Sequence, residues 1–244
     1  MSGAYTRPRA AGSLPFPTPP MVRVGALLVT AALFVTACSD STNPSPVATS
    51  ITTVRGASQS AVVGTALANP VVVQVNDQNG AVMAGVTVTF AALNGSTVDA
   101  STATTDANGQ AHVSWTLGTV AGADSLTVTA GTVAPVYEVA TGTPDAPMSL
   151  VPVSGSDQSA DAGNPLANPI VLRVVDRYGN AVAGVTVTWS SSSGALGAAS
   201  SVSDASGLAQ TTLTLGGDSG EDDVIATLTT ASGPVTLTFT ETAM

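Results

Sequence analysis

Hydrophobic and polar residues alternate along most of the chain from residue 47 onwards. In segments 86–90 and 111–117 every second residue is apolar, and threonine, serine or histidine occupies the positions between. A period of two places successive side chains on opposite faces of a β-strand. The pattern therefore predicts short, half-buried strands and no helix longer than a turn or two in this region. Further strands are predicted at 71–75, 126–130, 185–189, 213–215 and 235–239.

Turn signals separate these segments. Four of them begin with Asp and end with Gly three residues later, at 77–80, 106–109, 176–179 and 204–207. Asp and Gly favour turns because Asp bonds its own backbone and Gly adopts positive φ. About seven short strands in roughly 95 residues, with frequent turns, are typical of an Ig-like antiparallel β-sandwich. The predicted fold class is therefore all-β.

The chain contains two copies of one pattern. Between residues 64 and 90, 15 of 27 residues equal the residue 99 positions later. A repeat of this length is a domain and not a solenoid unit. We predict domain 1 at 47–143 and domain 2 at 144–244. A short linker with two prolines lies at 142–147, and 38–46 is a polar, flexible tether.

The N-terminal segment has the features of an export signal. Residues 24–35 are an apolar run that follows Arg23 and is too short to span a membrane as a stable helix. We expect translation to begin at Met21 and residues 1–37 to be removed. Residues 35–38, Val-Thr-Ala-Cys, resemble a bacterial lipobox. This resemblance implies cleavage before Cys38, lipidation of this cysteine and, with Ser39 after it, an outer-membrane location. The alternative is an ordinary signal peptide with an incidental cysteine.

Composition excludes several classes of function. Only 9% of the residues are charged, there is no lysine, and Cys38 is the only cysteine. Lysine Schiff-base chemistry, P-loop nucleotide binding, Cys-ligated zinc and a disulfide framework are therefore absent. Residues 38–244 contain three arginines and sixteen acidic residues, a net charge of −13. Such a surface repels nucleic acid.

Few residues point to catalysis or metal binding. The only histidine, His112, is predicted to lie on the exposed face of its strand, without a pocket in which a catalytic triad could converge. We expect neither an enzyme nor a cofactor. The densest acidic cluster could ligate calcium through oxygen atoms, although its spacing is not that of an EF-hand. The alternative is a solvated hairpin loop. The cluster consists of Asp218, Glu221, Asp222 and Asp223.

Aromatic residues and one ambiguous strand complete the prediction of the core. Phe90, Trp115 and Trp189 alternate with threonine or serine, so we expect them in the core and not on a sugar-binding surface. At 135–139 two alignments of the copies compete. We prefer the one that buries Tyr137 and Val139, because the other buries the carboxylate of Glu138, which is unfavourable without a partner.

The two copies resemble the bacterial Ig-like domains of group 1, which are the repeats of intimin- and invasin-type adhesins. The shared signature is a strand that ends in Asp, a turn Gly, Ala-Gly-Val-Thr-Val-Thr-aromatic, and then Thr-Asp-Ala-x-Gly-x-Ala. Copy two has Ser203 in place of the threonine. The residues that carry the signature are Asp77, Gly80, Gly85, Phe90, Asp106 and Gly109 in copy one and Asp176, Gly179, Gly184, Trp189, Asp204 and Gly207 in copy two.

This resemblance implies a non-enzymatic envelope or cell-surface lipoprotein that presents tandem Ig-like domains for adhesion or protein interaction. The membrane would be one partner, through the N-terminal lipid. A protein or glycan ligand would bind the domain 2 loops at 191–202 and 216–223, since loops on such scaffolds carry function. The alternatives are a structural spacer or envelope-assembly component without a ligand, and a polysaccharide-binding accessory module, which would require a row of exposed aromatic rings.

Overall fold

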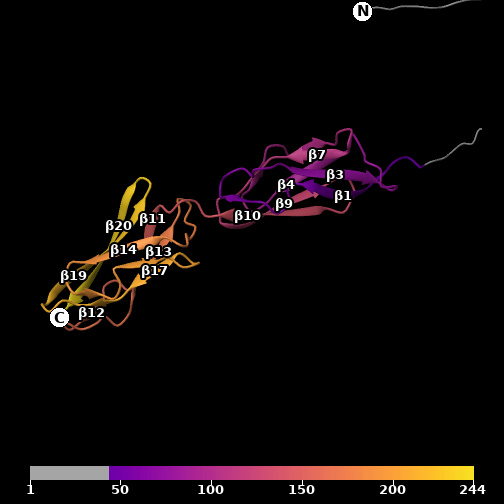
Figure 1. Cartoon of the computed structure of the whole chain (residues 1–244). Coiled ribbons are helices and arrows are strands. Elements are labelled where there is room, and N and C mark those ends of the chain that lie inside the picture. Colours follow the sequence, from indigo (N-terminus) through magenta and orange to yellow (C-terminus); the bar gives the residue numbers. More distant parts are fainter. Residues whose placement is uncertain (1–43) are drawn as a thin grey trace, which may run out of the picture. The chain divides into compact units, whose positions relative to one another are not determined.

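The computed structural model describes residues 44–244, which form two β-sandwiches in succession (Figure 1). We keep the names domain 1 and domain 2 for residues 47–143 and 144–244. The described residues contain no helix, as the alternating pattern predicts. Residues 44–244 therefore include no helix that is long and apolar enough to cross a membrane.

Domain 1 packs a three-stranded sheet against a five-stranded sheet. Strand order is β1-β3-β7 in the first and β2-β10-β9-β4-β6 in the second, and β5 pairs with β8 separately. All pairs are antiparallel except β2 and β10, which run parallel. The strands are β1 (Ala48–Arg55), β2 (Ser60–Val62), β3 (Val71–Asp77), β4 (Thr87–Ala92), β5 (Thr97–Val98), β6 (Thr102–Thr104), β7 (Gln110–Val113), β8 (Trp115–Thr116), β9 (Gly122–Thr129) and β10 (Val136–Thr143).

Domain 2 repeats this topology. Its sheets have the orders β11-β13-β17 and β12-β20-β19-β14-β16, with a separate β15–β18 pair. The strands are β11 (Ser149–Ser154), β12 (Ser159–Ala160), β13 (Ile170–Val175), β14 (Thr186–Ser191), β15 (Ala195–Leu196), β16 (Ser200–Val202), β17 (Leu208–Thr211), β18 (Leu213–Thr214), β19 (Gly220–Thr230) and β20 (Gly233–Ala243). The predicted fold class, all-β with two tandem Ig-like sandwiches, is confirmed.

The core of each domain lies between its two sheets. Trp115 and Phe90 are 1% and 2% exposed in domain 1, and Trp189 is 4% exposed in domain 2. Around them pack the inward valines, leucines and alanines of the alternating strands. His112 is exposed on β7 between buried Ala111 and Val113, as predicted. Burial of apolar side chains holds each sandwich together, because the described residues contain no cysteine.

The four Asp-x-x-Gly turns share one geometry. In each turn an Oδ1 atom of the aspartate accepts hydrogen bonds from the backbone N–H groups two and four residues later. The glycine has a φ of +70° to +86°, which other residues adopt reluctantly. The N–H donated by Ala81 lowers the pKa of Asp77, and that of Gln110 lowers the pKa of Asp106. The aspartates and glycines of the repeat therefore fix the turns.

The prediction for the last strand of domain 1 is wrong. Glu138 is only 6% exposed, whereas Tyr137 and Val139 are 68% and 50% exposed. Burial of Glu138 is tolerated because its carboxyl group has a partner, the Thr53 hydroxyl on β1, which donates a hydrogen bond to Glu138 Oε1. Sequence reasoning assumed an unpaired carboxylate and therefore placed Glu138 outside.

Neither alignment of the two copies describes this strand. In domain 1 Ala140 lies opposite Asp124, and in domain 2 Glu241 lies opposite Asp222. The copies are thus 98 residues apart on β9 and β19 but 101 apart on β10 and β20. The β19–β20 hairpin has three more residues, and it remains paired as far as Thr230 and Gly233.

Domain 2 buries a glutamate of its own. Glu241 on β20 is 0% exposed; its Oε2 atom accepts the N–H of Gln158 at 2.7 Å, and Oε1 has no hydrogen-bond partner. Burial raises the pKa of Glu241 above its ordinary value of 4.5, and the nearby charge of Asp157 adds to this effect. The folded protein therefore holds this proton more tightly than the unfolded chain does.

We predict that Glu241→Gln changes how stability depends on pH. In the wild type the stabilisation by the Glu241 proton is complete below pH 4.5 and is lost as the pH rises through the raised pKa of the folded state. Relative to the wild type, the variant should become increasingly more stable as the pH rises from 4 to 7, because it has no buried carboxyl group to ionise. Urea denaturation of both proteins at several pH values measures this difference. A difference that does not change with pH contradicts the prediction.

Candidate functional site: the interdomain junction and the distal loops

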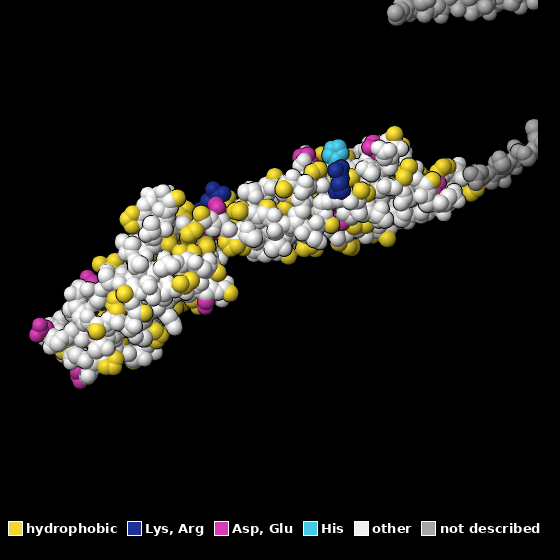
Figure 2. All heavy atoms as spheres, viewed as in Figure 1, with side chains coloured by type: hydrophobic (Ala, Val, Ile, Leu, Met, Phe, Trp, Pro, Cys, Tyr) yellow, Lys and Arg dark blue, Asp and Glu magenta, His cyan; other side chains and the backbone are white. Residues whose placement is uncertain are grey.

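The sequence-predicted site residues fall in separate places. Cys38 lies outside the described residues. His112 lines a shallow hollow on domain 1 with Arg55, Asp106 and Gln110. None of these neighbours is a nucleophile of the serine or cysteine type, and the N–H groups of the Asp106 turn already occupy one of its carboxylate oxygens. The histidine is seen beside an arginine on the surface of domain 1 in Figure 2.

The four acidic residues predicted as a calcium site point in different directions. Asp218 and Glu221 are exposed, whereas Asp222 is 2% exposed and turned inward. Asp223 accepts the Thr240 hydroxyl on the neighbouring strand at 2.7 Å. Across residues 44–244, no group of three or more His, Cys, Asp or Glu side chains is placed to hold a metal ion. Calcium binding stays a prediction, which a calcium titration of the mature chain checks.

Asp222 shapes the loop in which it lies. Its Oδ2 atom accepts the N–H of Gly216 at 2.7 Å, and its Oδ1 atom accepts the hydroxyl of Ser193. Domain 1 repeats the first contact, because Gly118 donates to Asp124 at 2.9 Å. In both domains an inward aspartate therefore holds the loop that leads into β9 or β19.

The loops predicted as ligand contacts lie together. Ser192 of segment 191–202 donates its N–H to the Asp223 carbonyl at 2.9 Å, and its hydroxyl accepts the Asp223 N–H at 2.8 Å. Gly163 also donates its N–H to the Gly216 carbonyl at 2.7 Å. Segments 191–202 and 216–223 thus contact each other near the Gly163–Gly216 bond, which we call the distal end of domain 2. The charged residues there are all acidic.

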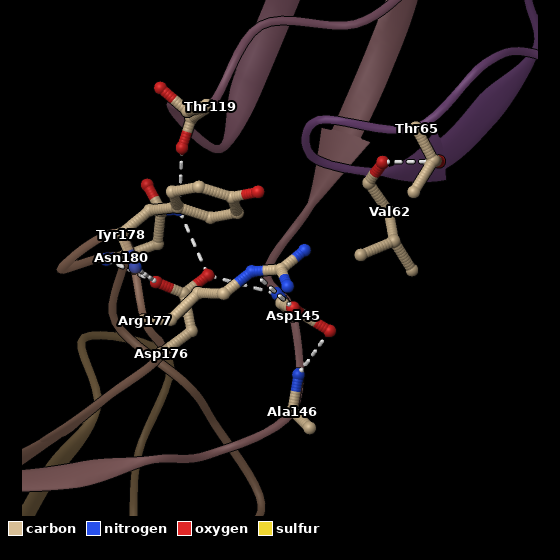
Figure 3. Close-up of polar contacts among 9 residues, drawn as sticks. All are labelled: Val62, Thr65, Thr119, Asp145, Ala146, Asp176, Arg177, Tyr178 and Asn180. Atoms are coloured by element: carbon tan, nitrogen blue, oxygen red, sulfur yellow. Dashed lines mark hydrogen bonds and ion pairs between the residues drawn. The ribbon is translucent and has the colours of Figure 1, made fainter.

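The corresponding end of domain 1 contacts domain 2. The carboxamide of Asn180 lies against the domain 1 loop 119–121: Nδ2 donates to the Thr119 carbonyl at 2.9 Å, and Oδ1 accepts the Ala121 N–H at 2.8 Å (Figure 3). This two-point contact resembles the pairing of backbone groups in a sheet and needs a side chain with both a donor and an acceptor. Asn180 therefore links the two domains.

Asp176 positions Asn180 and the linker together. Its Oδ2 atom accepts both the Asn180 Nδ2 group and the N–H of Asp145 in the linker, each at 2.9 Å. Burial acts to raise the pKa of Asp176, but the hydrogen bonds from Asn180, Asp145 and Tyr178 outweigh it and hold the pKa below its ordinary value. The carboxylate is therefore charged at neutral pH and holds turn and linker at one point.

Arg177 and Tyr178 complete the junction. The Arg177 Nε atom lies 3.0 Å from Asp145 Oδ2, and its guanidinium lies 4.6 Å from the centre of the Tyr178 ring. The Tyr178 hydroxyl lies so close to Gly64 of domain 1 that a Cβ atom built on this glycine would be 2.8 Å from it. Gly64 thus gives domain 2 room to approach. The exposed ion pair itself adds little stability.

The junction residues are those in which the two copies differ. Asn180, Tyr178 and Arg177 correspond to Ala81, Asn79 and Gln78 in domain 1. In domain 1 the turn faces the incoming chain instead of another domain, and Gln78 accepts the Val47 N–H at 2.8 Å. Sequence analysis missed the junction because it examined what the copies share. Their differences within this shared turn were the available signal.

Comparison with known proteins found one matching family model and several similar solved structures. Residues 151–240 match the model of the bacterial Ig-like domain, group 1. A Yersinia pseudotuberculosis InvD structure is 19% identical with a TM-score of 0.49, covering 75% of this chain and 54% of that one. The D00-D0 domains of intimin are 12% identical with a TM-score of 0.41, covering 80% and 99%. The Escherichia coli adhesin FdeC is 18% identical with a TM-score of 0.42, covering 77% and 62%. No curated protein matches the chain.

The family match defines the class of the molecule. Domain 2 is a bacterial Ig-like domain of group 1, since the matched residues run from the first to the last of its strands. Domain 1 has the same strand order and the same turn residues. The chain therefore carries one domain that matches this family model, preceded by a second domain of the same topology at 47–143.

We predict that Asn180→Ala uncouples the two domains. The substitution removes three side-chain hydrogen bonds, two of them to domain 1. At about 0.5–1.5 kcal/mol each, loss of the two bonds to domain 1 should weaken the coupling between the domains by roughly 1–3 kcal/mol. Calorimetry should show two melting transitions further apart than in the wild type. Ala81→Asn, which places the same side chain on the turn of domain 1, should leave the melting profile unchanged. An unaltered profile for Asn180→Ala would show that the junction carries no coupling.

Proposed function

We propose that this protein is a non-enzymatic, lipid-anchored protein of the bacterial cell envelope that presents its distal end for adhesion or protein interaction. The observation that carries the proposal is the order of parts along the chain. A candidate lipid anchor at Cys38 and a short tether come first, and two Ig-like domains joined by specific contacts follow. This order suits display of a binding surface away from a membrane.

The anchor is supported by the sequence before it. Residues 24–35 and the Val-Thr-Ala-Cys motif at 35–38 fit an exported lipoprotein, and Ser39 favours the outer membrane. A single acyl chain binds a membrane only marginally, so lasting attachment takes more than one chain. The resemblance of residues 35–38 to a lipobox implies that Cys38 carries several acyl chains. Such a cysteine would be a sufficient anchor.

The distal end of domain 2 is the proposed contact surface. β13 runs from the Gly163–Gly216 side of the sandwich to the Asp176 turn, so the junction and the distal end lie at opposite ends of this strand. Asp218 and Glu221 are exposed there and no basic residue accompanies them in segments 191–202 and 216–223. A protein ligand with a basic surface fits this charge best, since opposite potentials attract across an interface.

The structural-spacer alternative is favoured by one observation. The outer face of the five-stranded sheet of domain 1 carries threonine, serine and a few apolar side chains and has no charge, so it offers no arginine anchor. The polysaccharide alternative lacks its expected feature among the described residues. Tyr137 and Tyr178 are exposed but belong to different domains, and Phe90 and the two tryptophans are buried.

Mass spectrometry of the mature protein from envelope fractions tests the anchor. We expect an amino terminus at Cys38 that carries acyl chains, and we expect the protein in the outer membrane. Cys38→Ser should abolish lipidation and release the protein or leave its signal uncleaved. Wild-type protein found without lipid in the medium would contradict the proposed anchor. It would not contradict the structure of the two domains.

A loop exchange tests the contact surface. Replacing residues 216–221 by the domain 1 residues 118–123 keeps the glycine that donates to the inward aspartate and removes Asp218 and Glu221. We expect a loss of at least tenfold in attachment of cells that display the protein to host or neighbouring cells. Thermal melting of the exchanged protein is the control for folding. Unchanged attachment would favour the spacer alternative.

A further inference from the structure

Each domain buries one glutamate on its last strand, and each glutamate holds the segment where the chain enters that domain. In domain 1 Glu138 on β10 accepts the hydroxyl of Thr53 on β1. In domain 2 Glu241 on β20 accepts the N–H of Gln158, next to β12, at 2.7 Å. The two glutamates are not equivalent positions, because Glu138 lies opposite Leu126 and Glu241 opposite Asp222. The two contacts thus tie the last strand of each domain to its N-terminal part in different ways, through a hydroxyl on β1 in domain 1 and a backbone N–H beside β12 in domain 2.

The Thr53–Glu138 contact crosses between the two sheets. β1 belongs to the three-stranded sheet and β10 to the five-stranded sheet. Glu138 is 6% exposed and Thr53 is half-buried, so water cannot readily replace the bond. Without this contact β1 would be held by its antiparallel pairing with β3 and by apolar burial. The contact therefore ties the first strand of domain 1 directly to its last.

The segments by which the chain enters and leaves domain 1 are also paired in parallel, as strands β2 and β10. Thr141 donates its N–H to Gln59 at 2.9 Å, and Val63 donates to Thr143 at 2.9 Å, on either side of the β2–β10 ladder. Gly142 lies where a Cβ atom would come within 3.0 Å of Val63, so the two strands pack closely. Domain 2 repeats the ladder, with Thr242 donating to Gln158 at 2.9 Å.

Parallel pairing decides how these strands respond to tension. When the chain is pulled from both ends of a domain, the entering strand is drawn backward and the leaving strand forward. In a parallel pair these directions lie along the strands, so the hydrogen bonds are sheared together and do not open one at a time. The Thr53–Glu138 bond joins β1, which precedes β2 in the chain, to the same leaving strand β10, so tension at the entering end passes through it before it reaches the β2–β10 ladder.

We propose that these buried glutamates and the parallel strands beside them form a mechanical latch in each domain, which resists unfolding when the chain is stretched. The proposal rests on the proposed function, since tension arises when the protein is held at Cys38 and gripped at the distal end of domain 2.

Single-molecule pulling of the mature, unlipidated chain from residue 38 onwards tests this proposal. The thiol of Cys38, the only cysteine, attaches one handle, and a tag after Met244 attaches the other. A short glycine insertion after exposed Gly217 lengthens the extension released by domain 2 and so distinguishes the two unfolding events. Because the chain is pulled directly, the result does not depend on lipidation or on any ligand.

The decisive variant is Thr53→Val/Glu138→Leu, which removes both partners and leaves an apolar pair. Exchange of both partners of a buried hydrogen bond for apolar groups changes equilibrium stability little. Under load, however, we expect domain 1 to unfold roughly tenfold faster at a given force, while the domain 2 event is unchanged. Thr52→Val, on the exposed face of β1, is the matched control and should change neither event.

Glu241→Leu should produce the complementary result, with faster unfolding of domain 2 under load and no change in domain 1. The latch is refuted if the double variant unfolds at the wild-type force while its thermal stability is retained. It is also refuted if the variant loses thermal stability and mechanical resistance to the same degree, because the glutamate would then act as an ordinary stabilising contact. Neither outcome bears on whether Cys38 is lipidated in cells.

Discussion

Four aspartates that accept hydrogen bonds from their own turns fix the places where the chain passes from one sheet of a sandwich to the other. Each fixes the reversal between two strands without help from another element, through bonds of 2.8–2.9 Å to the N–H groups two and four residues later. Because side chains alternate along a strand, the length of such a turn sets which residues of the following strand face the core. The Asp176 turn has a second role, since its free carboxylate oxygen and Asn180 hold the linker and domain 1.

Carboxyl groups turned inward give these domains a polar framework within small-residue cores. Asp124 and Asp222 hold the loops before β9 and β19. Glu138 holds β1, and Glu241 holds the chain just before β12. Each buried group has at least one hydrogen-bond partner, as physical chemistry demands. Glu241 is the incompletely satisfied member, because one of its oxygens has none. Acidic residues in this chain therefore serve the interior as well as the surface.

Sequence patterns predicted the fold because its determinants are local. Alternation identified the buried faces around Trp115 and Phe90, and Asp and Gly identified the turns. Glu138 was misplaced because its hydroxyl partner, Thr53, is 85 residues away in the chain. The junction was also missed, since the contact of Asn180 with loop 119–121 depends on how two domains meet. Long-range pairing of polar groups is the part of this structure that the alternating pattern does not encode.

Specific side-chain contacts, and not the linker alone, join the two Ig-like domains. Residual dipolar couplings of the mature chain in a weakly aligning medium measure this most directly, because they report the alignment of each domain separately. If the contacts of Asn180, Asp176 and Tyr178 persist in solution, the two domains share one alignment tensor. Two tensors of different magnitude or rhombicity would mean that the domains reorient independently and would contradict the account.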